Sequence, residues 1–317
     1  MRAISALVVA SALVLSLAAC STPSPADRLA GDLASCDSSV NPGTSSDLVR
    51  ATGKGEPKVD YPAPLVTKRV ERSVITQGEG RVLRSGDIAE FQLVQYDGTT
   101  ADTFIGSSWE EAPSMITVGT GESLLAPLFE CVPVGSRIAG VIPASLISAE
   151  APKGATAVVV VDVVEGFASK SEGSPQLPDN GMPNVVLSES GQPGVVIPKS
   201  DPPTDLRIST LKAGSGAKIK KGDTVVVNYT GLLWKERTIF DSSWDKGTPA
   251  RFVAQSSADA AGGLVPGFAK ALIGAKVGDQ ILVVIPPKFG YESGTAPETI
   301  PDGSTMVFVI DILHIAD

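Results

Sequence analysis

The chain has 317 residues and a formal net charge of −9, with 26 Lys and Arg against 35 Asp and Glu. Its single His argues against His-based catalytic triads and His-rich metal sites, and its three Cys are too few for a four-cysteine zinc site. The acidic balance argues against a nucleic-acid partner, and the length suits about two domains.

The first twenty residues have the pattern of a secretory signal, with one basic residue (Arg2), an apolar stretch and small residues before Cys20. The closing Leu-Ala-Ala-Cys resembles the bacterial lipobox, in which the Cys thiol is acylated and becomes the mature N-terminus. We therefore expect a lipoprotein signal peptide over 1–19, lipidation of Cys20 and a chain anchored to the extracytoplasmic side of the cell membrane. The alternative is ordinary cleavage near an A-x-A site, with Cys20 incidental.

Two cysteines remain, Cys36 and Cys131. In an exported protein an even pair suggests a disulfide, which here would tie the N-terminal segment to the first domain. By the chain-entropy model a loop of this length contributes about 4–5 kcal/mol. The alternative is two unrelated buried thiols.

Two Pro-, Gly- and Ser-rich segments alternate with two strand-rich blocks. We expect residues 20–64 to be a tether and N-terminal extension, and residues 168–203 to be an interdomain linker. The blocks share four segments in the same order, namely 80–87 with 216–223, 106–109 with 241–244, 134–143 with 277–286, and 152–156 with 301–305. The chain is therefore a tandem repeat of a domain of about 100 residues. The first block spans 65–167 and the second block 204–317.

In the second block, β-branched runs between turn residues predict strands over 224–233, 280–285 and 306–312, with His314 following as a structural residue. Residues 266–274 begin with Pro and end at Gly, which predicts one short helix. Several strands with one short helix indicate an α+β domain, in which a curved antiparallel sheet wraps over the helix. A pocket between sheet and helix would be lined by aromatic and aliphatic side chains.

The second block also resembles the FKBP-type peptidyl-prolyl cis-trans isomerases over about residues 204–317. The motifs, in family order, are 227–231 (VNYTG), 240–243 (FDSS), 263–268 (GLVPGF), 275–278 (AKVG), 285–287 (IPP), 289–291 (FGY), 300–301 (IP) and the closing VFVIDIL. The resemblance implies two FKBP-like domains and an isomerase site in the second, which acts on proline-containing exported polypeptides without a cofactor.

The resemblance implies pocket walls and a floor made by four aromatic side chains, those of Tyr229, Phe240, Phe268 and Phe308. The chemistry agrees with this composition. Rotation about an X–Pro amide has a barrier of about 18–20 kcal/mol, which amide resonance sets. A twisted amide has lost that resonance and is less polar, so an apolar, water-poor pocket favours it over the planar form. Neither imidazole nor metal is needed.

Polar roles follow from the same resemblance. The backbone N–H of Val265 would bind a substrate carbonyl, Asp241 would face the carbonyl region, Tyr291 would donate to the peptide backbone, and Ile300 would lie on a loop over the pocket. Macrolide ligands are also implied. Phe268 where Trp is frequent, and Ala250 where a pocket aromatic is common, weaken that expectation more than they weaken isomerase activity.

The first block lacks the site. At the positions of Tyr229, Asp241 and Phe308 it has Leu93, Gly106 and Val159, and the stretch matching 289–300 is shortened to 146–151. We expect it to be no isomerase and leave open whether it is a spacer, a substrate-binding module or an aid to stability. We expect the chain to be a monomer. The alternative function for the whole chain is that of a non-catalytic peptide-binding chaperone.

Overall fold

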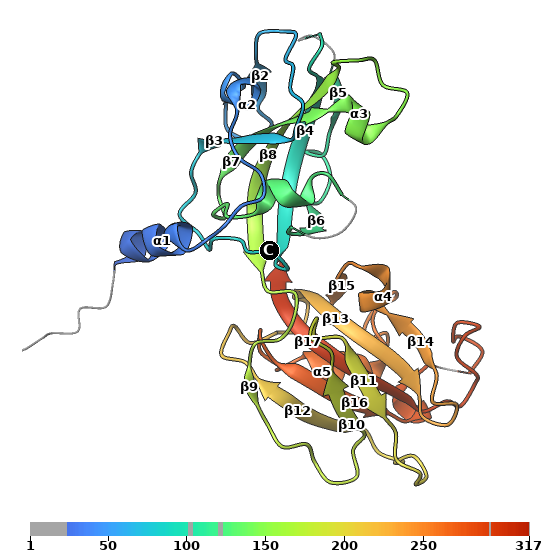
Figure 1. Ribbon diagram of the computed structural model, residues 1–317. Helices are drawn as coiled ribbons and strands as arrows, with labels where there is room; N and C mark the ends of the chain where they lie inside the picture. Colours follow the sequence, from blue (N-terminus) through green and yellow to red (C-terminus); the bar gives the residue numbers. More distant parts are fainter. Residues whose placement is uncertain (1–23, 101–103, 120–122, 292, 317) are drawn as a thin grey trace, which may run out of the picture.

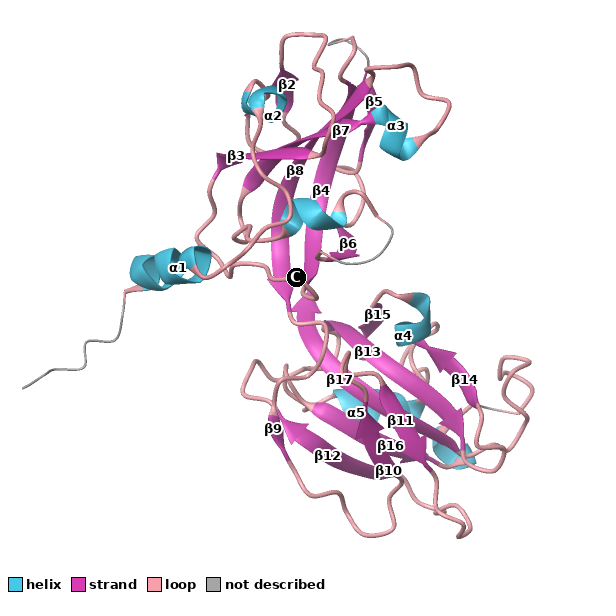
Figure 2. Cartoon of the chain, in the orientation of Figure 1, coloured by secondary structure: helices cyan, strands magenta, loops and turns pink. Residues whose placement is uncertain are grey.

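The computed structural model describes residues 24–100, 104–119, 123–291 and 293–316, and contains two large antiparallel sheets in tandem (Figures 1 and 2). The predicted signal peptide and Cys20 lie outside the described residues. No helix within these ranges is long and apolar enough to cross a bilayer.

The first sheet has the strand order β3-β7-β8-β4-β5, with β6 pairing to β4. Its strands are β3 (Glu71–Thr76), β4 (Ile88–Asp97), β5 (Phe104–Ser107), β6 (Ser114–Thr117), β7 (Arg137–Pro143) and β8 (Thr156–Phe167). A 3-10 helix, η1 (Ala126–Phe129), packs its buried Leu128 and Phe129 into the core of this block. A short helix, α3 (Ala144–Ile147), follows β7.

The second sheet repeats that order as β12-β16-β17-β13-β14, with β15 pairing to β13 and β9 added at the edge. Its strands are β9 (Ser174–Pro175), β12 (Arg207–Ala213), β13 (Thr224–Leu233), β14 (Ile239–Ser242), β15 (Ala250–Val253), β16 (Gln280–Ile285) and β17 (Met306–Ala316). The helices are α4 (Ser243–Lys246), α5 (Pro266–Leu272) and the 3-10 helix η2 (Pro287–Phe289). The strands predicted over 224–233 and 280–285 are confirmed, and the last strand continues to Ala316.

The strand registers confirm the alignment of the two blocks. Leu93 lies opposite Val161 on β8, as Tyr229 lies opposite Ile310 on β17. Gln95 pairs with both Val159 and Gly106, whereas Gly231 pairs with both Phe308 and Asp241. Leu93, Gly106 and Val159 therefore occupy the positions of Tyr229, Asp241 and Phe308.

The predicted short helix is confirmed as α5, which packs against β16. Gly267 permits this close approach, because a Cβ there would lie 2.6 Å from the Ile285 side chain. Phe268 and Leu272 are buried in the core between helix and sheet, with 4% and 0% of their surface exposed.

The segment before the second block is largely folded, which the linker prediction missed. Its hairpin, β10 (Asn184–Leu187) with β11 (Pro193–Val196), brings the buried Met182 and Ile197 against the outer face of the second sheet. That face consists of Leu232, Trp234, Leu282, Val284, Val307 and Val309. The two strands have only four residues each, and the Pro and Gly residues around them are typical of loops. The sequence therefore did not predict the hairpin.

The segment before the first block is also folded and also covers the outer face of a sheet. It contains α1 (Pro25–Ala34), α2 (Thr44–Asp47) and a hairpin of β1 (Arg50–Thr52) with β2 (Lys58–Asp60). Val49, Tyr61 and Leu65 are buried against the outer face of the first sheet, at Val94, Ala139, Val141, Val158 and Val160. The described part of the predicted tether and N-terminal extension thus includes a folded cover of the first sheet.

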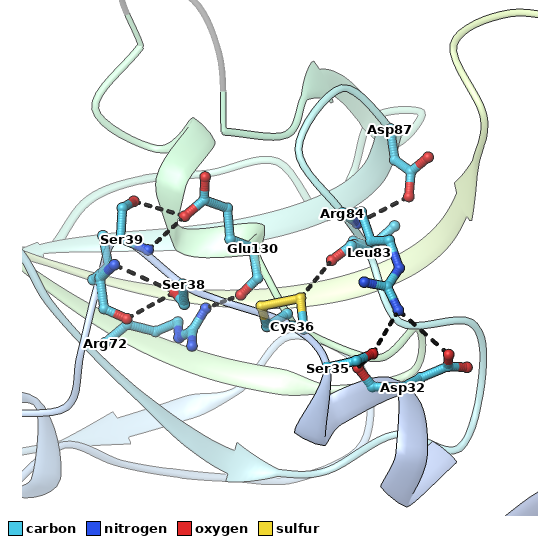
Figure 3. Close-up of a disulfide and its surroundings, with 12 residues drawn as sticks. Asp32, Ser35, Cys36, Ser38, Ser39, Arg72, Leu83, Arg84, Asp87 and Glu130 are labelled. Atoms are coloured by element: carbon cyan, nitrogen blue, oxygen red, sulfur yellow. Dashed lines mark hydrogen bonds and ion pairs between the residues drawn. A yellow bond between two sulfur atoms is a disulfide. The ribbon is translucent and has the colours of Figure 1, made fainter. Parts of the chain in front are cut away.

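The predicted disulfide between Cys36 and Cys131 is present, with a Cα–Cα distance of 5.6 Å (Figure 3). Cys131 follows η1 by two residues. Beside the bond, Ser39 donates from its backbone N–H and its hydroxyl to Glu130, at 2.8 and 2.6 Å. The N-terminal segment is therefore held to the first block covalently and by hydrogen bonds.

Candidate active site

The second block contains a cavity of about 430 Å³ between its sheet and α5. The residues lining it are Tyr229, Phe240, Asp241, Phe252, Ser257, Gly263, Leu264, Val265, Phe268, Gly290, Tyr291, Thr295 and Phe308. Seven of the eight predicted site residues are in this set, Ile300 being the exception. The cavity therefore gathers residues that are up to 79 positions apart in the sequence, from Tyr229 to Phe308.

The aromatic residues meet mainly edge to face. Phe268, on α5, lies 5.0 Å from Phe308 and 6.3 Å from Tyr229, between ring centroids, with interplanar angles of 87° and 86°. Phe240 meets Phe308 at 5.5 Å and 89°. In this geometry each ring edge, which is electropositive, faces an electronegative ring face, so the wall is fixed as well as apolar.

Phe252 is a pocket residue that the motif alignment missed. Its ring centroid lies 5.5 Å from that of Phe268 and 5.6 Å from that of Tyr229. The alignment pointed to Ala250 as a missing aromatic. Residues two apart on a strand share a face, so the position of Phe252 on β15 was the available signal. With Tyr291, the pocket thus has six aromatic side chains.

Val265 is the residue that precedes α5, and its backbone is extended, with φ −52° and ψ 142°. Its carbonyl accepts from Phe268 and Ala269, at 2.9 and 3.1 Å. Its N–H donates no hydrogen bond to any residue within the described ranges. A donor at the cavity wall with no acceptor among the described residues is free to bind a carbonyl.

The Asp241 carboxylate is held by two donors. It accepts from the Tyr229 hydroxyl and from Lys246, whose Nζ lies 2.5 Å away. Burial raises the pKa of Asp241, but the hydrogen bonds from Lys246 and Tyr229 lower it by more, so the pKa lies below its usual value. Burial and the bond to Asp241 raise the pKa of Tyr229. The pocket edge therefore carries an ionised carboxylate that Tyr229 and Lys246 hold in place.

The FDSS motif holds this edge in place. The Ser243 hydroxyl accepts from the Tyr229 N–H at 2.9 Å and donates to Asn228 Oδ1 at 2.7 Å. The Ser242 side chain caps α4. Both serines are buried, so the turn that presents Asp241 is tied to β13 from within.

Tyr291 follows η2, lines the cavity and is 38% exposed. Burial, and then the charge of Asp241, raise its pKa, so the hydroxyl remains a proton donor. Ile300 is only 6% exposed and packs in the core rather than lining the cavity. Its side chain belongs to the same buried cluster as Tyr229, Phe268 and Phe308, so Ile300 packs with the pocket aromatics and does not line the cavity itself.

No group of three or more His, Cys, Asp or Glu side chains within the described ranges is arranged to hold a metal ion. In the first block the matching positions are aliphatic where the second has aromatics: Leu93 for Tyr229, Ile116 for Phe252 and Val159 for Phe308.

Known proteins resemble the second block. A family described as FKBP-type peptidyl-prolyl cis-trans isomerase matches residues 215–313. An FK506-binding protein of Streptomyces anulatus is 33% identical over 119 residues, which cover 37% of this chain and 92% of the relative. FkpA, an FKBP-type peptidyl-prolyl cis-trans isomerase of Escherichia coli, is 37% identical over 112 residues, which cover 35% and 38% of the two chains.

Among solved structures, that of Escherichia coli FkpA has a TM-score of 0.32 at 31% identity, over 44% of this chain and 54% of that one. The three FKBP domains of wheat FKBP73 have a TM-score of 0.32 at 16% identity, over 78% and 94%. Since the match at 33% identity covers nearly the whole Streptomyces relative, the chain belongs to the FKBP-type peptidyl-prolyl cis-trans isomerase family.

Proposed function

We propose that the protein catalyses cis–trans isomerisation of X–Pro bonds in exported polypeptides outside the cytoplasmic membrane, at the cavity of the second block. One observation supports this most: six aromatic rings, the Asp241 carboxylate and a Val265 N–H with no acceptor among the described residues surround one cavity. In this proposal lipidated Cys20 anchors the chain. Mass analysis of the mature N-terminus tests the anchor. A mature chain that begins after Cys20, or that begins at Cys20 without an acyl group, would contradict it.

The proposed mechanism uses differential solvation. The proline ring enters between Phe268, Phe252 and Phe308, where little water remains to stabilise the polar planar amide. The Val265 N–H holds the substrate carbonyl, and Asp241 lies beside the carbonyl group as it turns. Because the twisted amide is the less polar form, this environment lowers the rotation barrier without any covalent step.

We expect the full chain carrying Tyr229→Ala and Asp241→Val to lose about a hundredfold in kcat/KM, because both the wall and the fixed charge are removed. An exchange assay on an X–Pro peptide measures this. The matched control is Leu93→Ala with Gly106→Val at the same positions of the first block, where a Cβ on Gly106 meets open space. Full activity in the Tyr229/Asp241 variant would refute the assignment of the site.

The rate should not depend on pH between about 5 and 9. The lowered pKa of Asp241 keeps its carboxylate ionised throughout this range, and the raised pKa values of Tyr229 and Tyr291 keep both hydroxyls protonated. The only His, His314, lies on β17 and does not line the cavity. A profile of kcat/KM against pH checks this, and a bell shape centred near neutrality would contradict it.

The second candidate is a non-catalytic peptide-binding chaperone. The first block favours it, because Leu93 and Val159 there replace the pocket aromatics Tyr229 and Phe308. It predicts binding of a proline peptide by the wild-type chain with no change in exchange rate. We further propose macrolides such as FK506 as competitive ligands, since the Streptomyces relative carries that name. Inhibition of exchange by FK506 would support this, and undiminished exchange at saturating FK506 would exclude it.

A further inference from the structure

The two blocks share a buried contact where the ends of β4 and β8 meet the ends of β13 and β17 (Figure 1). Ile88 and Phe167 of the first block pack with Val226 and Leu313 of the second, all at most 6% exposed. The ring of His314 stacks on that of Phe167, with 4.9 Å between centroids and 4° between planes. The blocks are therefore in direct apolar contact.

An ion pair crosses the same contact. Arg251 Nη2, from β15, lies 2.8 Å from Glu90 Oε1 on β4, and the Glu90 side chain is only 7% exposed. Both Nη atoms of Arg251 also donate to the Pro113 carbonyl at 3.1 Å, just before β6. Apart from Arg251, Glu90 Oε1 has no polar partner within the described residues. The buried charge of Glu90 thus depends on Arg251.

The strand that carries Arg251 also carries a wall of the pocket. β15 has four residues and pairs with β13 and with no other strand among those described. Successive side chains on a strand point to opposite faces, so Arg251 points to the first block and Phe252 to the cavity. Whatever fixes Arg251 therefore also fixes the backbone next to Phe252.

The pairing links positions that differ between the two repeats. Met115 lies opposite Glu90 in the first block, as Arg251 lies opposite Val226 in the second. Met115 is thus the counterpart of Arg251, and Val226 that of Glu90. Neither block contains both charges at these positions, so the pair forms only across the contact.

We propose that Arg251 and Glu90 are positioning residues for the isomerase site: the first block, through Glu90 and Pro113, holds β15 and so sets the position of Phe252 against Phe268 and Tyr229. This inference rests on the proposed function. It gives the first block, which lacks the pocket aromatics, a part in the reaction of the second.

The test compares four variants of the full chain in the exchange assay, alongside wild type. Arg251→Met introduces the residue of the matching position in the first block, and Glu90→Gln changes only the first block. We expect each to lower kcat/KM about tenfold, because a displaced wall fits the twisted amide less well. Arg251→Lys, which keeps the charge, should recover part of the loss. Aromatic NMR signals of Phe252 should shift in the Met and Gln variants.

The matched control is His314→Ala, which removes an apolar contact of the same interface without touching β15. It should lower the melting temperature yet retain wild-type kcat/KM. Wild-type kcat/KM in folded Arg251→Met and Glu90→Gln would overturn the proposal, as would an equal loss in His314→Ala. An inactive wild-type chain would instead refute the proposed function, so the two failures are distinguishable.

Discussion

Replacing Phe268 by Ala should remove most of the isomerase activity and lower the free energy of unfolding of the second block by about 3–5 kcal/mol. Phe268 is 4% exposed, and its ring meets those of Phe252, Phe308 and Tyr229. Its loss opens a cavity in the core and admits water to the floor of the pocket. Both the packing and the apolar medium that favours the twisted amide are lost together.

The measurements are denaturant unfolding and the exchange assay, both on the full chain. Leu128→Ala is the matched control, because Leu128 of η1 is fully buried in the core of the first block. It should destabilise the first block by a comparable amount while the rate stays near that of wild type in the folded protein. Phe268→Trp should retain activity. An active Phe268→Ala variant would show that the floor is not used in catalysis.

Removing the disulfide is the second large effect. We expect Cys36→Ser with Cys131→Ser to lower the free energy of unfolding of the first block by about 4–5 kcal/mol, because a bond across 95 positions restricts the unfolded chain. The bonds from Ser39 to Glu130 remain and hold the segment only weakly once the covalent link is gone.

Calorimetry with and without a reductant measures this effect. The transition of the first block should move to lower temperature in the variant and in reduced wild type alike, whereas the reductant should leave the variant unchanged. The control is unfolding of the second block, which contains no Cys. Equal midpoints for variant and wild type would show that the non-covalent contacts alone hold the segment.

Local patterns in the sequence predicted much of the second block. The β-branched run over 224–233 matches β13 from end to end, since its length and turn residues leave little choice. Pro266 marks the start of the helix and Gly274 lies just beyond its end, because each residue restricts or frees its own backbone conformation. The motif residues Tyr229, Asp241 and Val265 all line one cavity, and the resemblance to the FKBP family had pointed to each of them.

What the sequence did not reveal depends on contacts between distant segments. Phe252 lines the pocket although the alignment pointed to Ala250, and Ile300 packs in the core although the resemblance placed it on a loop over the pocket. In the sequence, nothing distinguishes Arg251 from a surface charge. Its ion pair with Glu90, 161 positions earlier, is seen only in the structure. Such pairings are set by how the blocks pack, which neither strand pattern nor motif spacing encodes.

The two covering hairpins determine where the chain can be divided. β1–β2 covers Ala139, Val141, Val158 and Val160, and β10–β11 covers Leu282, Val284, Val307 and Val309, which are the matching positions of the second sheet. Each sheet therefore has a hairpin over the same apolar positions. Cutting the chain at residue 204 would remove β10–β11 from the second sheet and expose those side chains to water, so an isolated second block has to begin before β10.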